Sequence, residues 1–169
     1  MQLIYVGLFI PHRSMDQLML PINSNIQDPH VTMRYYGNVA VNELTSTDKH
    51  KIGAYTQIQP WAMITSNDTD LIVCRKSHQG MSVIPHITLR VSNGAKAVDS
   101  NKFADGYEIL FKNRVFDPQL NGPAQIDALN KFRELHPDAR IFKYGSIAPI
   151  EVRWGAFTSN GEVIYDLPK

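Results

Sequence analysis

Two six-residue stretches, PHVTMR at residues 29–34 and PHITLR at residues 85–90, carry almost the same sequence. Pro, His, Thr and Arg recur at the same positions, and the two positions that differ exchange one apolar side chain for another. Because side chains alternate between the two faces of a strand, each copy predicts a strand with an apolar face and a polar face. Proline before the histidine suits the start of such a strand.

The polar faces of the two predicted strands suggest a shared site. They carry His30, Thr32 and Arg34 in the first copy and His86, Thr88 and Arg90 in the second. If the strands lie side by side, two imidazoles and two hydroxyls face one cleft. Imidazoles titrate near neutral pH, so one can act as a general base and the other as a general acid. The hydroxyls can donate to phosphate oxygens, and this chemistry requires no metal ion.

Other readings of the motif remain open. One His-x-Thr on a strand is common and is most simply a hydrogen-bonded polar residue. Strand packing does not require the same pattern twice, and the repetition therefore favours function. Two histidines could ligate zinc, but a zinc site takes three or four ligands, and no third ligand stands at a suggestive spacing. No serine stands in a recognisable nucleophile context.

The remaining sequence predicts an α+β fold with a mainly antiparallel sheet. Further strands are predicted at 3–10, 55–65, 71–76 and 107–116, and in a hairpin over 150–157 and 162–167. Helices are predicted after a capping box at Ser14–Gln17, weakly within 42–53, and clearly over Pro123–His136. The apolar stripe of the last helix is expected to face the core and consists of Ile126, Leu129, Phe132 and Leu135.

Composition indicates one globular domain over residues 1–169, expected to be monomeric. The net charge is +1 and no basic run occurs, which argues against extended duplex binding and favours a small ligand or a nucleic-acid end. No apolar run reaches membrane-spanning length, and no signal peptide is recognised. The single cysteine, Cys74, is expected to be buried and inert, and we expect a cytoplasmic protein.

The motifs HVTM (30–33) and HITL (86–89) resemble the paired His-x-Thr-x motifs of the 2H phosphoesterases. The segment HITLRVSNGAKAVDSN resembles one in the cyclic phosphodiesterase domains of eukaryotic tRNA ligases and in myelin-type cyclic nucleotide phosphodiesterases. The resemblance covers residues 3–116 and the last hairpin. It implies a bilobal fold of two pseudo-symmetric halves, each mainly antiparallel sheet with flanking helices, around a central cleft.

The resemblance implies a metal-independent phosphodiesterase, without a cofactor, that hydrolyses a 2′,3′-cyclic phosphate on a nucleotide or RNA end. His30 and His86 would form the acid–base pair, and Thr32 and Thr88 would hold the phosphate. In the cyclic phosphodiesterase branch, His86 would activate water and His30 would protonate the leaving oxygen. One alternative is a phage-type enzyme that degrades cyclic di- or oligonucleotide signals. A different class is a non-catalytic module that binds RNA ends or nucleotides, but the intact pair favours catalysis.

Additional substrate contacts are expected around the motifs. Arg34 and Arg90 would add phosphate contacts if the strand register places them on the cleft face. Base recognition needs a stacking side chain, and the candidates are Tyr5, Trp61, Tyr36 and Phe103. The chain between positions 30 and 86 is short for the family, which implies that elements covering the substrate are trimmed.

Overall fold

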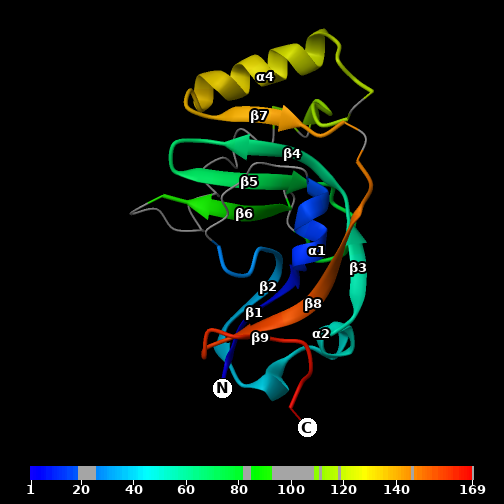
Figure 1. Ribbon diagram of the computed structural model, residues 1–169, viewed down its shortest axis with the longest axis vertical. Coiled ribbons are helices and arrows are strands. Elements are labelled where there is room, and N and C mark those ends of the chain that lie inside the picture. The colour runs from blue at the N-terminus through cyan, green and yellow to red at the C-terminus, as the bar shows by residue number, and fades with distance from the viewer. Residues whose placement is uncertain are drawn as a thin grey trace.

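The protein has an α+β fold of two antiparallel sheets with few helices, as the sequence predicts (Figure 1). The computed structural model spans residues 1–169 and describes residues 1–18, 26–81, 85–92, 109–110, 112–117, 119–145 and 147–168. Sheet A has the strand order β2-β1-β8-β3, with β9 added beside β8, and sheet B has the order β6-β5-β4-β7.

The two sheets lie at opposite ends of an elongated molecule, and each hexapeptide begins an edge strand (Figure 1). The strands of sheet A are β1 (Leu3–Phe9), β2 (His30–Val39), β3 (Tyr55–Ile58), β8 (Ile150–Thr158) and β9 (Val163–Ile164). The strands of sheet B are β4 (Pro60–Thr65), β5 (Thr69–Cys74), β6 (His86–Val91) and β7 (Arg140–Lys143). The helices are α1 (His12–Met15), α2 (Ser46–Lys51) and α4 (Pro123–Leu135), with short 3₁₀ turns at Asp16–Leu18 and Val41–Glu43.

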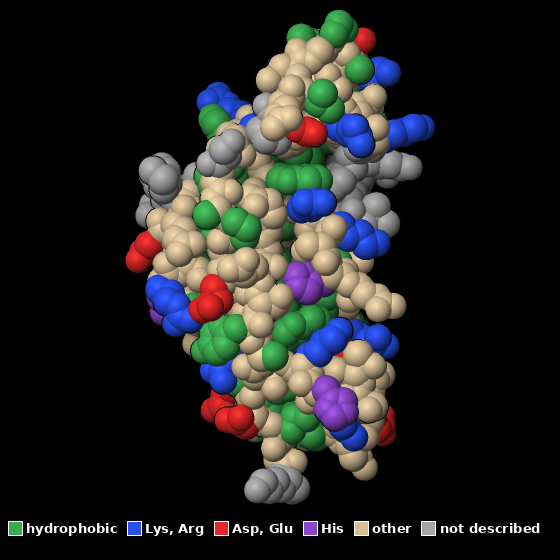
Figure 2. Space-filling view, turned by 90° about the vertical axis from the view of Figure 1, so that its right-hand side faces the viewer, with side chains coloured by type: hydrophobic (Ala, Val, Ile, Leu, Met, Phe, Trp, Pro, Cys, Tyr) green, Lys and Arg blue, Asp and Glu red, His purple; other side chains and the backbone are tan. Residues whose placement is uncertain are grey.

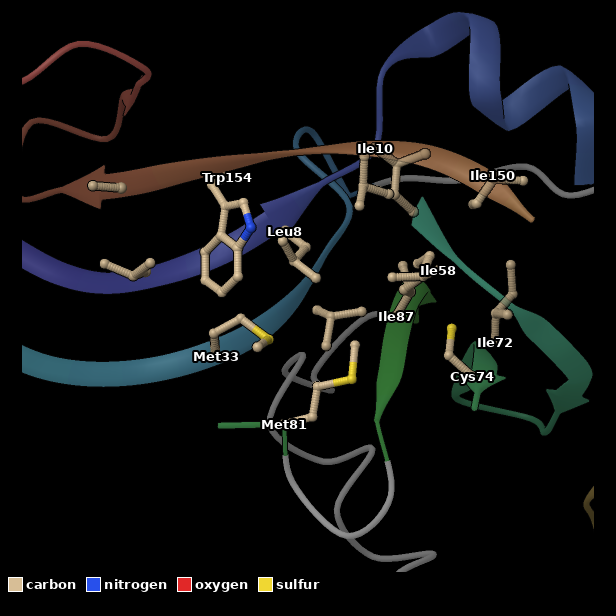
Figure 3. Packing of buried hydrophobic residues seen from close by; sticks show 14 of the residues in the cluster. Leu8, Ile10, Met33, Ile58, Ile72, Cys74, Met81, Ile87, Ile150 and Trp154 are labelled. Carbon is tan, nitrogen blue, oxygen red and sulfur yellow. The ribbon is translucent and has the colours of Figure 1, made fainter. Parts of the chain in front are cut away.

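One hydrophobic core joins the two sheets. Figure 3 shows Leu8 and Trp154 of sheet A and Ile72 and Ile87 of sheet B with their side chains directed into the same interior. Strands β2 and β6 contact each other across this junction. A second core lies on the other face of sheet B, where Phe132 of α4 packs against apolar residues of β4 and β5. The edge strands that carry the two motifs are thus neighbours in space.

The predicted apolar face of each motif is confirmed. Val31 and Met33 of β2, like Ile87 and Leu89 of β6, are buried in the core that joins the sheets. The expected burial of Cys74 is also confirmed, and burial raises the pKa of its thiol to about 12. The thiolate is therefore scarce at neutral pH, which fits the expected inert side chain.

Three predictions about elements need correction. The first helix begins at His12 rather than after Ser14, because the Ser14 hydroxyl donates to the Glu151 carbonyl on β8 (2.7 Å) and does not cap the helix. The strand predicted at 55–65 is divided at Gln59, where the chain passes from sheet A to sheet B. The strand predicted at 107–116 is wrong, since the described residues among these form a helical turn and turns.

The long helix α4 is confirmed, but the face it buries differs from the predicted stripe. Gly122 precedes Pro123 at its first position, and the Gln125 side chain accepts the Gly122 N–H (2.8 Å). Phe132 is fully buried, whereas Ile126 and Leu135 are each about half exposed. The helix lies across the outside of sheet B, close to β7 (Figure 1).

Candidate active site

The two hexapeptides are built into their sheets in the same way. The Pro29 carbonyl accepts the N–H of Ile10 at the end of β1 (3.0 Å). The Pro85 carbonyl accepts the N–H of Cys74 at the end of β5 (2.9 Å). Proline has no N–H to offer a ladder, and in both copies its carbonyl anchors the motif to the neighbouring strand just before the histidine.

Both motif strands also bulge at the same position. Thr32 lies opposite Gly7 and Arg34 lies opposite Val6, so β2 has one extra residue between Thr and Arg. In β6, Thr88 lies opposite Leu71 and Arg90 opposite Asp70, which leaves the same single extra residue. An extra residue reverses the faces of the side chains that follow it. The arginines therefore do not share the face of the histidine and threonine.

Each arginine instead forms an ion pair with an aspartate of its own lobe. Arg34 Nε lies 3.2 Å from a carboxylate oxygen of the buried Asp48. Arg90 binds Asp70 through Nε (2.7 Å) and a terminal nitrogen (3.2 Å). The expectation that both arginines face the cleft is wrong, because it assumed an unbroken strand register. Their recurrence in the two copies is explained by these ion pairs.

The structure brings the two histidines together. The Ile26 N–H donates to the Leu89 carbonyl (3.4 Å), so the segment before β2 lies beside β6. His30 follows Ile26 by four residues, His86 precedes Leu89 by three, and their strands β2 and β6 contact each other. His86 is close enough to His30 for its charge to lower the pKa of His30.

The orientation of the His30 imidazole is fixed by its own loop. Nδ1 lies 2.8 Å from the Asp28 carbonyl, which can only accept, so Nδ1 carries the proton and donates. Nε2 is left as the basic nitrogen of the neutral ring. Burial lowers the pKa of His30; the Asp28 hydrogen bond and charge oppose this, and the His86 charge lowers it further.

Aromatic side chains of strand β1 pack against the His30 ring. Tyr5 stacks on the imidazole with centroids 4.6 Å apart, and Phe9 lies at 5.1 Å. Gly7 stands between them, and a Cβ there would lie 3.4 Å from His30 Cδ2 and 3.0 Å from the Val31 carbonyl oxygen. Glycine therefore makes room for the imidazole on the sheet. Tyr5, one of the predicted stacking residues, is therefore in contact with a motif histidine.

The other predicted site residues have different positions. Thr32 is exposed and Thr88 is half-buried, each two residues after its histidine. Trp61 stacks on Phe116 (centroids 6.1 Å apart) beside the second core. The Tyr36 hydroxyl donates to Asp48 (2.5 Å). Phe103 lies outside the described residues.

Four residues around His30 and Tyr5 were not predicted from sequence. Phe9 and Asp28 contact His30, whereas Phe157 stacks on Tyr5 and Tyr35 lies opposite Tyr5. Tyr35 lies opposite Tyr5 and is 71% exposed, because the bulge turns it to the face of Tyr5. The spacing of Tyr5, Gly7 and Phe9 on one strand face could have revealed Phe9, but nothing in the sequence indicates the bulge.

A cavity of about 330 Å³ lies beside the loop that precedes His30. It lies between the end of β1, helix α1 and the loop before β2, and its lining includes Phe9, Met15, Ile26, Asp28 and Tyr165. In the described part of the chain, no three His, Cys, Asp or Glu side chains gather as a metal site would need. Nor do the described helices include one long and apolar enough to span a membrane.

No known protein family and no curated protein matches the sequence. The fold is similar to a crystal structure described as that of a fungal RNA kinase, with a TM-score of 0.44 and 12% sequence identity. The match covers 90% of this chain and 46% of the other, so the chain spans about half the length of that protein. A likeness at this level carries no argument about activity, and the function must be inferred from the site itself.

Proposed function

We propose that this protein is a phosphodiesterase that opens the 2′,3′-cyclic phosphate of a nucleotide or RNA end. The observation that carries the proposal is the meeting of His30 and His86, which begin the edge strands of two different sheets and interact electrostatically. Each is followed by a threonine two residues later, before the bulge. This arrangement supplies two titratable groups and two hydroxyls to one phosphate.

In the proposed reaction, a water oxygen bonds to phosphorus while the bond from phosphorus to one ribose oxygen breaks. One imidazole accepts the proton of the water, and the other gives its proton to the departing ribose oxygen. The diester becomes a monoester, and charge is balanced when the two histidines exchange protons with solvent. The hydroxyls of Thr32 and Thr88 donate to the non-bridging phosphate oxygens.

The surroundings of His30 support its assignment as the base. A base must be neutral before the reaction, and burial lowers the pKa of His30. The hydrogen bond from Nδ1 to Asp28 leaves Nε2 free of a proton to receive one from water. We therefore assign the base to His30 and the acid to His86, the reverse of the order that the family resemblance implies.

A substrate panel tests the activity. It compares 2′,3′-cyclic mononucleotides, RNA that ends in a cyclic phosphate, and cyclic dinucleotides, and chromatography identifies the product. We expect turnover of the first two classes in a strong chelator and a loss of about 10²–10⁴-fold in each of His30→Ala and His86→Ala. Absence of turnover with every substrate would favour a binding module, and a chelator-sensitive activity restored by zinc would favour a metal site.

A substrate with a good leaving group separates the two roles. A 2′-deoxynucleoside 3′-(4-nitrophenyl phosphate) releases nitrophenolate, which needs no protonation, so the acid becomes dispensable but the base does not. With this substrate, His86→Ala should regain activity relative to its activity on the cyclic phosphate, while His30→Ala should remain inactive. The opposite pattern would make His86 the base.

A further inference from the structure

A row of aromatic and basic side chains leads away from His30 across sheet A. Phe9 of β1 lies opposite His30 of β2. Arg153 of β8 lies opposite both Phe9 and Tyr55 of β3. Residues paired in this way point to the same face of a sheet, so these side chains share the surface of His30. With neighbouring strands about 4.8 Å apart, Tyr55 is roughly 14 Å from His30.

The basic member of this row is held between rings. The guanidinium carbon of Arg153 lies 4.4 Å from the centroid of Tyr165 and 5.0 Å from that of Tyr55. Its Nε donates to the Gly53 carbonyl (3.0 Å), which fixes the side chain. Tyr55 is 51% exposed. We call Tyr165, Arg153 and Tyr55 the stacking row. Phe9 is buried (2% exposed) and lies between this row and His30.

The cavity beside the loop that precedes His30 lies at the beginning of the stacking row. Phe9 and Tyr165 both line it, with their rings edge to face at 6.3 Å. Asp28 also lines it and binds the His30 ring through its carbonyl. A volume of about 330 Å³ with a mainly apolar lining that includes Phe9 and Tyr165 suits a flat nitrogenous ring. The Asp28 carboxylate can accept from an exocyclic amino group.

We propose that the stacking row binds the nucleotides that precede the cyclic phosphate, so that the substrate is the end of a single-stranded RNA. This inference rests on the proposed function. Exposed rings that stack on bases, together with a cation for the backbone, are the combination that holds single strands. The row reaches roughly 14 Å from His30, which is farther than one nucleoside extends from its phosphate.

The charge pattern favours a single strand over a duplex. Figure 2 views the side of the molecule on which β3 runs in Figure 1, and there Lys and Arg stand in separate groups among apolar and acidic side chains. A duplex needs many phosphate contacts from a concentrated basic surface. Arg153 and Arg13 lie 5.0 Å and 5.7 Å from the centroid of the exposed Tyr55 ring. Two cations beside a ring match a short segment whose bases are unpaired.

The test compares a nucleoside 2′,3′-cyclic phosphate with a pentanucleotide that ends in the same group. We expect a kcat/KM at least about tenfold higher for the pentanucleotide, since one stacked base contributes that much. In Arg153→Gln and Tyr55→Leu, the ratio of the two kcat/KM values should fall about tenfold. Lys51→Gln is the matched control. Lys51 Nζ lies 4.7 Å from the ring centroid of Trp154, which follows Arg153 on β8 and faces the core on the opposite side of the sheet.

A direct binding measurement separates this inference from the proposed function. Fluorescence anisotropy follows a labelled pentanucleotide with an ordinary 3′-hydroxyl end as salt is raised. Arg153→Gln should weaken binding and reduce the slope of log affinity against log salt by about 0.7, the value for one phosphate contact. Equal kcat/KM for both substrates, or an equal effect of Arg153→Gln and Lys51→Gln, overturns the inference. Tight binding of the pentanucleotide without turnover of any cyclic phosphate would overturn the proposed function, but the stacking row would remain a binding site for single strands.

Discussion

The imidazole of His30 makes stability depend on pH in a direction that its burial determines. Burial lowers its pKa in the folded protein, so the unfolded chain binds the proton more readily. The stabilising contribution is present above the unfolded pKa of about 6.5 and is lost as pH falls below it. When pH is lowered from about 7.5 to 5.5, the free energy of unfolding of His30→Asn should fall less than that of wild type. Urea unfolding at each pH measures this difference.

The control for this experiment is His50→Asn, since His50 is exposed on α2. His30→Asn should depart from the wild-type curve by more than His50→Asn does. If His30→Asn followed the wild-type curve, the ring of His30 would not be desolvated in the folded protein.

Gly7 is the residue that admits the His30 ring to the sheet surface. In Gly7→Ala, the new methyl group would crowd the Val31 carbonyl (3.0 Å) and His30 Cδ2 (3.4 Å). We expect kcat for a cyclic mononucleotide to fall about tenfold or more, because a displaced catalytic group loses its alignment. Overpacking should also cost about 1–3 kcal/mol of the free energy of unfolding.

Gly122→Ala is the comparison for Gly7→Ala. Its methyl group would lie 3.1 Å from Oε1 of Gln125 in the first turn of α4, and neither motif histidine is among its neighbours. It should lose some stability and keep the kcat of wild type. An equal loss of kcat in both variants would show that lower stability, and not the position of His30, limits activity.

At this scale the sequence predicts part of the site. Alternation placed His30 and Thr32 on one face and Val31 on the other, because these positions precede the bulge. It failed for Arg34, since a bulge depends on the register of the partner strand and no residue of the motif announces it. Asp28 acts on His30 through its backbone carbonyl, and a carbonyl is common to every residue type.

Helix α4 was predicted correctly as an element, but the face that it buries was predicted incorrectly. Its buried side holds Ala128 and Phe132, while Ile126 and Leu135 stand half exposed. We expect Phe132→Ala to cost about 3–5 kcal/mol of the free energy of unfolding. Leu135→Ala should cost less than about 1 kcal/mol. Urea unfolding of both variants measures the difference, and equal costs would mean that Leu135 is covered in solution.

Element prediction succeeded where local signals agree and failed where tertiary contacts decide. Proline at the first position of α4 and the pattern behind it specify that helix without help from other elements. Ser14 could cap a helix, but its hydroxyl instead donates to a carbonyl of β8, which is distant in sequence. The run YEILFKNRVF has strand propensity, yet its described residues end in turns, and Arg114 adopts a positive φ of 54°.

For the whole molecule, the core between the sheets predicts cooperative unfolding. Side chains from both sheets, among them Leu8 and Ile87, share one cluster. The site depends on this junction, because His30 and His86 come from different sheets. A core common to both lobes means that neither sheet can lose its packing without exposing apolar surface of the other. We therefore expect residues 1–169 to unfold as a single unit.

The two tryptophans of the chain report on the two cores separately. Trp154 lies in the core that joins the sheets, and Trp61 packs against the core under α4. In the single-tryptophan variants Trp61→Phe and Trp154→Phe, urea unfolding followed by fluorescence should match unfolding followed by circular dichroism in the same variant. Trp154→Phe reports on Trp61, and Trp61→Phe reports on Trp154. If the Trp61 fluorescence transition occurred at higher urea than the Trp154 transition, and neither matched the circular dichroism curve of its variant, sheet B and α4 would persist after the junction opens. Activity would then be lost with the first transition, because His86 would remain on a folded sheet without His30 beside it.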